Sequence, residues 1–221
     1  MLLLNPKKYN VEFPDKESKE MMLKTIEWFE KKGLKKVKED FHNRTWPEDF
    51  VEFQKQHKIF AKLLTPAGYG AADNRWDTYR IYHWAELMGF YGIAYWYVWD
   101  VSQLGICPIW MGSNEEAKHK AAKLLEEGHV FAFGLSEKEH GADIYSSDMM
   151  LYPQGDGTYK GNGDKYYIGN GNKAAMVSTF AKIADSDDYV FFCVDSRHPN
   201  YECVQNTVAH QNYVSEYAVH D

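Results

Sequence analysis

The sequence has few cysteines, no excess of basic residues and no long apolar run, and each shortage argues against a class of protein. Its three cysteines, Cys107, Cys193 and Cys203, show no C-x-x-C spacing, which indicates reduced thiols rather than a disulfide framework. The net charge of −7 argues against a broad nucleic-acid surface, because such a surface needs a basic field. We therefore predict no nucleic-acid partner.

No apolar stretch approaches the roughly 20 residues that a membrane-spanning helix needs, so we predict no membrane span. The apolar start at residues 1–4 is also too short for the core of a signal peptide. Together with the reduced thiols, these features predict a cytoplasmic protein, or one of the mitochondrial matrix if the source is eukaryotic.

The composition is that of a globular chain with a proper core, because 44% of the residues are hydrophobic and 16% are aromatic. In the first half, apolar residues recur with helical spacing, and Gly33 interrupts the first such segment. The stretch 93–104 is apolar on all sides, as in a buried central helix. The segments with a helical pattern are 17–32, one that begins at 45–49, 77–90, 93–104 and 117–127.

After Gly128 the pattern changes to alternating β-branched and aromatic residues between glycine-rich turns. We predict strands at 176–183, 189–194 and 213–219, a hairpin turn between two strands at 154–158, and another tight turn at 161–164. The chain therefore reads as α+β: an all-helical domain at 1–128 and an antiparallel, barrel-like β domain at 129–221.

Two stretches in the second half carry the candidate chemistry. The apolar strand at 130–135 stops at Ser136 and opens into a polar loop, which offers free backbone N–H groups and a hydroxyl to a polar ligand. The stretch 165–171 places two tyrosines and an isoleucine before a Gly/Asn turn. Together they predict a frame for one flat aromatic cofactor, although either alone reads as an ordinary loop or core strand.

These stretches resemble the acyl-CoA dehydrogenase family. Leu-Ser-Glu at 135–137, followed by Gly-Ala-Asp at 141–143, is similar to the family's Leu-Thr-Glu-x-x-x-Gly-Ser-Asp. Lys-Tyr-Tyr-Ile-Gly-Asn-Gly at 165–171 is similar to its Lys-x-Trp-Ile-Thr-Asn-Gly. The resemblance implies the family's N-terminal helical and middle β domains. It also implies a C-terminal helical domain, or a partner chain, that is absent from this sequence and supplies the catalytic base and much of the homo-oligomer contact.

The resemblance also implies roles for single residues. The backbone around Phe133, Leu135 and Ser136 would face the polar edge of the flavin of FAD, and the Ser136 hydroxyl would add a donor. Gly141 and Ala142 would lie near the cofactor's pyrophosphate and the acyl-CoA substrate. Ala142 stands where the family has a serine, so that side-chain contact is lost.

The second motif would supply the face of the flavin site. Tyr167, at the family's tryptophan, would stack on the flavin ring, with Ile168 and Gly169 beside it. Gly169 replaces a threonine whose hydroxyl reaches the flavin near its reactive nitrogen, so the tuning of hydride acceptance is in doubt but the binding is not.

The activity implied is FAD-dependent α,β-dehydrogenation of an acyl-CoA thioester in fatty acid and lipid metabolism, with an electron-transfer flavoprotein as electron acceptor. No residue of this chain is assigned as catalytic base. Two alternatives stay open: a flavin monooxygenase on the same fold, and a non-catalytic cofactor-binding or scaffold subunit.

Other patterns are given a structural interpretation. The G-x-G-x-x-A pattern at 169–174 is not a dinucleotide fingerprint, because a strand rather than a helix is predicted to follow it. The polar side chains of Glu137, Glu139, His140 and Asp143 are predicted to be solvated and to bind no metal. The aromatic run 91–99 is predicted to pack in the core, with the lining of an acyl pocket as the alternative.

Overall fold

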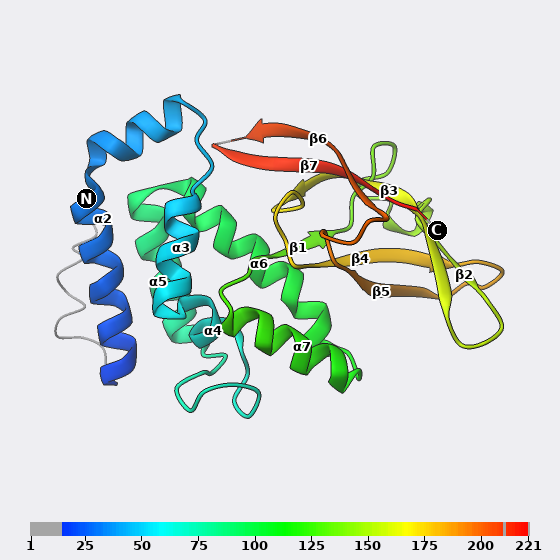
Figure 1. The fold of residues 1–221 in the computed structure, drawn as a ribbon, viewed down its shortest axis with the longest axis horizontal. Helices are drawn as coiled ribbons and strands as arrows, with labels where there is room; N and C mark the ends of the chain where they lie inside the picture. Colours follow the sequence, from blue (N-terminus) through cyan, green and yellow to red (C-terminus); the bar gives the residue numbers. More distant parts are fainter. Residues whose placement is uncertain (1–14, 210, 221) are drawn as a thin grey trace.

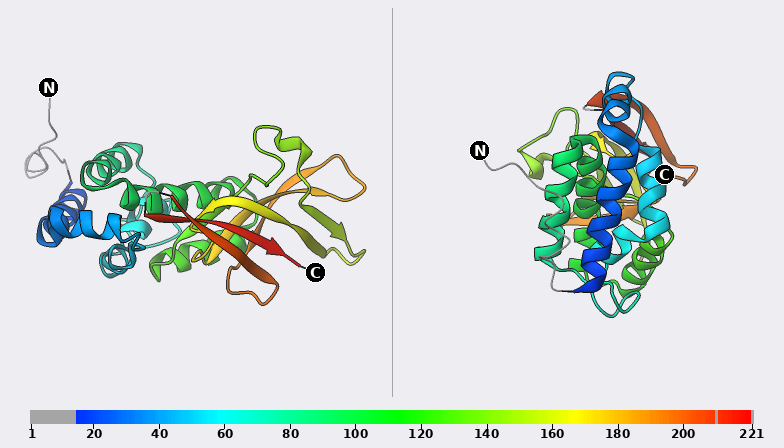
Figure 2. Two further views of the ribbon diagram at one scale, coloured as in Figure 1. Left: turned by 90° about the horizontal axis from the view of Figure 1, so that it is seen from above. Right: turned by 90° about the vertical axis from the view of Figure 1, so that its left-hand side faces the viewer.

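A helical part and a β part lie at opposite ends of an elongated molecule, and α6 and α7 reach from one toward the other (Figures 1 and 2). The computed structural model describes residues 15–209 and 211–220. Its helices are α2 (Lys16–His42), α3 (Glu48–His57), α4 (Ile59–Leu64), α5 (Thr78–Tyr91), α6 (Ile93–Met111) and α7 (Glu115–Glu126). Its strands are β1 (Phe131–Gly134), β2 (Met150–Pro153), β3 (Tyr159–Gly169), β4 (Met176–Ile183), β5 (Tyr189–Val194), β6 (Tyr201–Ala209) and β7 (Asn212–Val219).

The helices begin where the sequence offers caps. Asp15, Asp77 and Asn114 each accept hydrogen bonds from backbone N–H groups of the first turn, which removes part of the cost of leaving those donors unpaired. The interruption predicted at Gly33 is a kink inside α2, where the glycine has φ 75° and ψ 148°. The helix resumes beyond it, so α2 is longer than the predicted segment.

The α6 helix is the centre of the molecule, because it contacts α5 on one side and β1 and β4 on another. Tyr95 and Trp99 pack in a core that also includes Phe131 of β1 and Met176 of β4. The prediction that this helix is buried on all sides was wrong, since Ile93 is exposed. The division of the chain at residue 128 stays a prediction.

The sheet has seven strands in the order β1-β4-β2-β3-β7-β6, with β5 on the other edge of β4. The α+β prediction is confirmed, but the sheet is mixed and does not close into a barrel. Both β1 and β2 run parallel to β4, while the remaining pairs are antiparallel. The chain returns through β3 before it enters β4, and this crossover is what makes the parallel pairs possible.

Several predicted strands are confirmed, whereas the turn predicted at 161–164 was wrong because these residues lie inside β3. The glycine at position 163 serves a close approach between β3 and the segment just before β2, not a turn. Gly163 has φ 143°, and a Cβ there would lie 2.8 Å from the Cα of Met149. The hairpin turn predicted at 154–158 between two strands is confirmed, since it joins β2 to β3 and the two strands pair antiparallel. The strand β6 was not predicted, because it is polar and mostly exposed and so lacks an alternating apolar pattern. None of the described helices is long and apolar enough to cross a membrane.

Candidate functional site

The candidate site is built around one loop at the edge of β4. The strand β5 occupies one edge of β4, and β1 and β2 lie one after the other along its other edge. Residues 135–149, which we call the 135–149 loop, therefore leave the sheet after β1 and return to it at β2. Within this loop, residues Ile144–Ser146 form a short 3-10 helix, η2.

The structure brings the two predicted motifs together. The backbone N–H of Tyr166 donates to the carbonyl of Ser136 at 2.9 Å, and the Ser136 hydroxyl donates to the carbonyl of Tyr166 at 2.7 Å. This pair of hydrogen bonds holds the start of the 135–149 loop against β3. The hydroxyl proton of Ser136 is thus already used within the protein, while its oxygen keeps acceptor capacity.

Glu137 is the buried anchor of the 135–149 loop. Only 7% of Glu137 is exposed, and its carboxylate accepts from the ammonium of Lys165 at 2.6 Å and from the hydroxyl of Ser147 at 2.6 Å. Backbone N–H groups at 148–149 complete its hydrogen bonds. The prediction of a solvated Glu137 was wrong, because Lys165 of β3 is fully buried directly beside it.

The protonation state of Glu137 follows from these contacts. Burial raises the pKa of Glu137, but the hydrogen bonds from Lys165 and Ser147 outweigh burial and hold the pKa below its ordinary value. The charged carboxylate of Glu137 therefore links the end of the loop, at residues 147–149, to Lys165 of β3. The only sign in the sequence was that a lysine opens the second motif.

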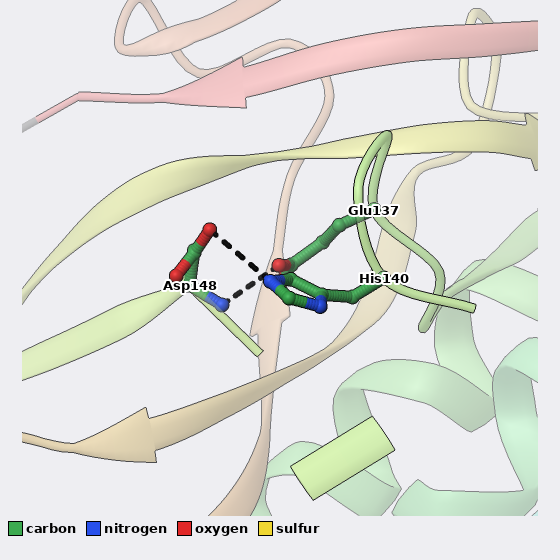
Figure 3. Close-up of side chains that lie close together, drawn as sticks. All are labelled: Glu137, His140 and Asp148. Carbon is green, nitrogen blue, oxygen red and sulfur yellow. Dashed lines mark hydrogen bonds and ion pairs between the residues drawn. The ribbon is translucent and has the colours of Figure 1, made fainter. Parts of the chain in front are cut away.

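His140 lies beside this anchor, close to Glu137 and Asp148 (Figure 3). Its Nδ1 is 2.8 Å from a carboxylate oxygen of Asp143, and its Nε2 is 3.4 Å from one of Asp148. The ligand atoms of Glu137, His140 and Asp148 all lie within 4.8 Å of one another. We assign no metal to them, because the Lys165 ammonium already binds Glu137 and would repel a second cation.

The ion pairs of His140 with Asp143 and Asp148 are expected to stabilise the 135–149 loop in a pH-dependent way. The hydrogen bond to Asp143 raises the pKa of His140 above its ordinary value of 6.5, and the charges of Asp148 and Glu137 act in the same direction. Since the folded pKa exceeds the unfolded one, the stabilisation is fully present below about pH 6.5 and is lost as pH rises through the folded pKa. An NMR titration of the His140 imidazole should give a pKa above 6.5, and Asp143→Asn should lower it. A pKa at or below 6.5 would contradict a stabilising ion pair between His140 and Asp143.

A bulge in β3 presents Tyr167. The register between β3 and β7 shifts between Lys165 and Ile168, and Tyr167 adopts a left-handed backbone with φ 67°. This leaves 54% of Tyr167 exposed, while Ile168 turns into the core. The tyrosine ring is therefore accessible to a ligand, and any contact from Ile168 is through its backbone.

Gly169 is packed against a side chain that the sequence analysis missed. A Cβ at Gly169 would lie 2.7 Å from the hydroxyl of Tyr97 and 2.8 Å from its ring. Tyr97 of α6 thus fills the space that a threonine side chain would take in the resembled motif. Burial raises the pKa of Tyr97, so its hydroxyl stays a neutral donor at physiological pH. The helical position of Tyr97 gave no sign of this contact.

The other predicted residues differ in what they offer. Among the described residues, no hydrogen-bond partner is found for the backbone N–H groups of Leu135 and Ser136. The N–H of Gly141 is already bonded to Asp143 at 2.9 Å, and both Gly141 and Ala142 are exposed. The ring of Phe133 stacks on Phe191 with 5.3 Å between centroids. The N–H groups of Leu135 and Ser136 are therefore free to donate to a ligand at the start of the loop.

Comparison with known proteins identifies the fold. No protein-family model and no curated protein matches the sequence. Butyryl-CoA dehydrogenase from Megasphaera elsdenii superposes with a TM-score of 0.82 and 22% identity over 96% of this chain and 57% of its own. Acyl-CoA dehydrogenase complexed with FAD from Bacillus anthracis gives a TM-score of 0.78 and 22% identity over 95% of this chain and 36% of its own.

A third solved structure, PigA with FAD and proline, matches with a TM-score of 0.75 and 16% identity over 95% of this chain and 56% of its own. The chain thus spans little more than half the length of the butyryl-CoA dehydrogenase and of PigA. At these identities the likeness establishes an acyl-CoA dehydrogenase-like fold, which confirms the expected fold.

Proposed function

We propose that this chain forms the helical and β portion of a flavoenzyme that dehydrogenates acyl-CoA thioesters between their α and β carbons, with FAD as cofactor. The observation that carries the proposal is the joining of the two motifs by Ser136 and Tyr166 beside free backbone donors. Solved proteins of this fold that are described with FAD or as acyl-CoA dehydrogenases support it.

The residues present fit a flavin. Two backbone N–H groups, of Leu135 and Ser136, suit a polar ring edge, and the accessible ring of Tyr167 suits its flat face. The hydroxyl of Tyr97 stands beside Gly169, where the resembled motif has a threonine hydroxyl. The residues proposed to contact the cofactor are Phe133, Leu135, Ser136, Gly141, Ala142, Tyr167, Ile168 and Gly169, with Ala142 also at the substrate.

When bound, FAD would supply the acceptor for the hydride of the β carbon, and the residues of this chain would bind and orient its ring. The buried Glu137–Lys165 pair holds the 135–149 loop so that its donors keep their positions. The base that removes the α proton is proposed to lie in a C-terminal helical domain or a partner chain. An electron-transfer flavoprotein as acceptor and homo-oligomerisation are part of the same proposal.

Flavin binding is the first test. Titrating the purified chain with FAD should quench the flavin fluorescence, and Tyr167→Ala should weaken the affinity about tenfold through the lost stacking. The matched control is Tyr152→Ala, an exposed tyrosine on β2, which should bind FAD like the unaltered chain. A chain that takes up no flavin, or equal affinities for the two variants, would overturn the proposed site.

The reaction is tested under anaerobic conditions on this chain together with the proposed C-terminal helical domain or partner chain. An acyl-CoA thioester should bleach the bound flavin, and the chain length that bleaches it fastest defines the substrate. Bound flavin that no thioester bleaches, but that reacts with oxygen once chemically reduced, would instead support the monooxygenase alternative.

A further inference from the structure

A pocket lies between α5 and α6. Its volume is about 470 Å³, within the roughly 300–1,000 Å³ typical of small-molecule sites. Helix α5 and the residues before it supply one wall, including Trp76 and Tyr82, and α6 supplies the other, including Trp96, Asp100 and Gln103. The pocket is separate from the 135–149 loop, none of whose residues lines it.

Among the described residues that line the pocket, Asp100 is the one charged group. Among the described residues, no hydrogen bond or ion pair reaches the carboxylate of half-buried Asp100, and burial alone raises its pKa. No lysine, arginine or histidine is among the described residues that line the pocket. A partly desolvated carboxylate without a counter-charge is costly for the fold. Its charge is complementary to a cation rather than to an anion.

The walls define what kind of cation would fit. Four aromatic residues, Trp76, Tyr82, Trp96 and Trp99, are among those that line the pocket. Trp99 is the most buried of them, 2% exposed, and its indole N–H has no partner among the described residues. Aromatic faces attract cations through their ring quadrupole and favour apolar, methylated ammonium groups over strongly hydrated metal ions. A metal ion would need several oxygen ligands, and the lining supplies one carboxylate.

We propose that the α5–α6 pocket binds a small quaternary ammonium compound, with the aromatic rings against its methyl groups and Asp100 as its counter-ion. The pocket is distinct from the flavin site, because none of the residues proposed to contact FAD lines it, although the charge of Asp100 also acts on Tyr97.

The test compares two ligands that differ in charge and not in shape. Choline and 3,3-dimethylbutan-1-ol are titrated into the full chain in a calorimeter, without flavin. Choline should bind at least about tenfold more tightly, and Asp100→Asn should remove most of that preference. The matched control is Glu86→Gln, which removes an exposed acid on α5 outside the pocket lining and should change choline affinity less than about twofold.

The outcomes are distinct. Equal binding of the two ligands would identify a general apolar pocket and overturn the proposal, and so would the absence of choline binding. A second variant, Trp96→Leu, should lower the affinity for choline, and thermal unfolding shows whether this variant is folded. An unchanged affinity in the folded variant would contradict the role of the aromatic residues. Because no flavin is present, failure here leaves the flavoenzyme proposal untouched, and failure to bind FAD leaves this one untouched.

Discussion

Lys165→Met should lower the free energy of unfolding by about 3–5 kcal/mol, because it leaves the buried carboxylate of Glu137 without its cation. The ammonium of Lys165 is fully buried, bonds Glu137 at 2.6 Å and also donates to the carbonyl of Leu135 at 3.1 Å. Urea unfolding followed by circular dichroism measures the change. Weaker binding of FAD should accompany it, since the same pair holds the start of the 135–149 loop.

The matched control for this variant is Lys138→Met. Lys138 is an exposed neighbour of Glu137, and its ammonium lies 5.9 Å from the centroid of the Tyr166 ring. Its replacement should change stability by no more than about 0.5 kcal/mol. The double variant Glu137→Leu/Lys165→Met should recover part of the loss, because no buried charge is then left unpaired. If Lys165→Met costs no more than Lys138→Met, the pair does not anchor the loop.

Gly105→Ala should destabilise the fold by about 3 kcal/mol or more, as overpacking against rigid backbone does. A Cβ at Gly105 of α6 would lie 2.4 Å from the carbonyl oxygen of Ala132 and 2.6 Å from its backbone nitrogen. The neighbour is main chain of β1, so it cannot move aside as a flexible side chain would. The glycine permits the close contact between α6 and the sheet that positions Tyr97 beside Gly169.

A second glycine provides the opposite expectation. Gly89 lies in α5, and a Cβ there would meet nothing within 4 Å. Gly89→Ala should therefore stabilise the chain by about 0.5–1 kcal/mol through helix propensity. Thermal unfolding of the two variants compares them directly. A similar small effect for both substitutions would show that α6 and β1 are not packed as closely as the structure has them.

Local sequence patterns were sufficient for much of the fold. Helical spacing predicted α5 and α7, and alternation predicted β4 and β5 with their bounds. Errors arose where one residue has two local interpretations. Gly163 looks like part of a turn, yet it lies inside β3. A glycine is needed there because Met149 passes too close to leave room for a side chain.

The candidate site divides in the same way. The two motifs were predicted to frame one flat cofactor, which stays a prediction; the hydrogen bonds between Ser136 and Tyr166 show that the motifs lie side by side. The neighbours that complete the site were not predictable. Glu137 is buried because Lys165 comes from a distant strand, and Tyr97 meets Gly169 from a helix much earlier in the chain.

Asp100 is the clearest example of this difference. Periodicity places it on α6, but a helical pattern cannot say that α5 lies beside it with Trp76 and Tyr82, or that no described cation pairs with it. Backbone geometry repeats every few residues, so short windows of sequence carry the information for helices, strands and turns. Contacts between side chains far apart in the chain, and the charges that they leave unpaired, exist only once the elements have packed.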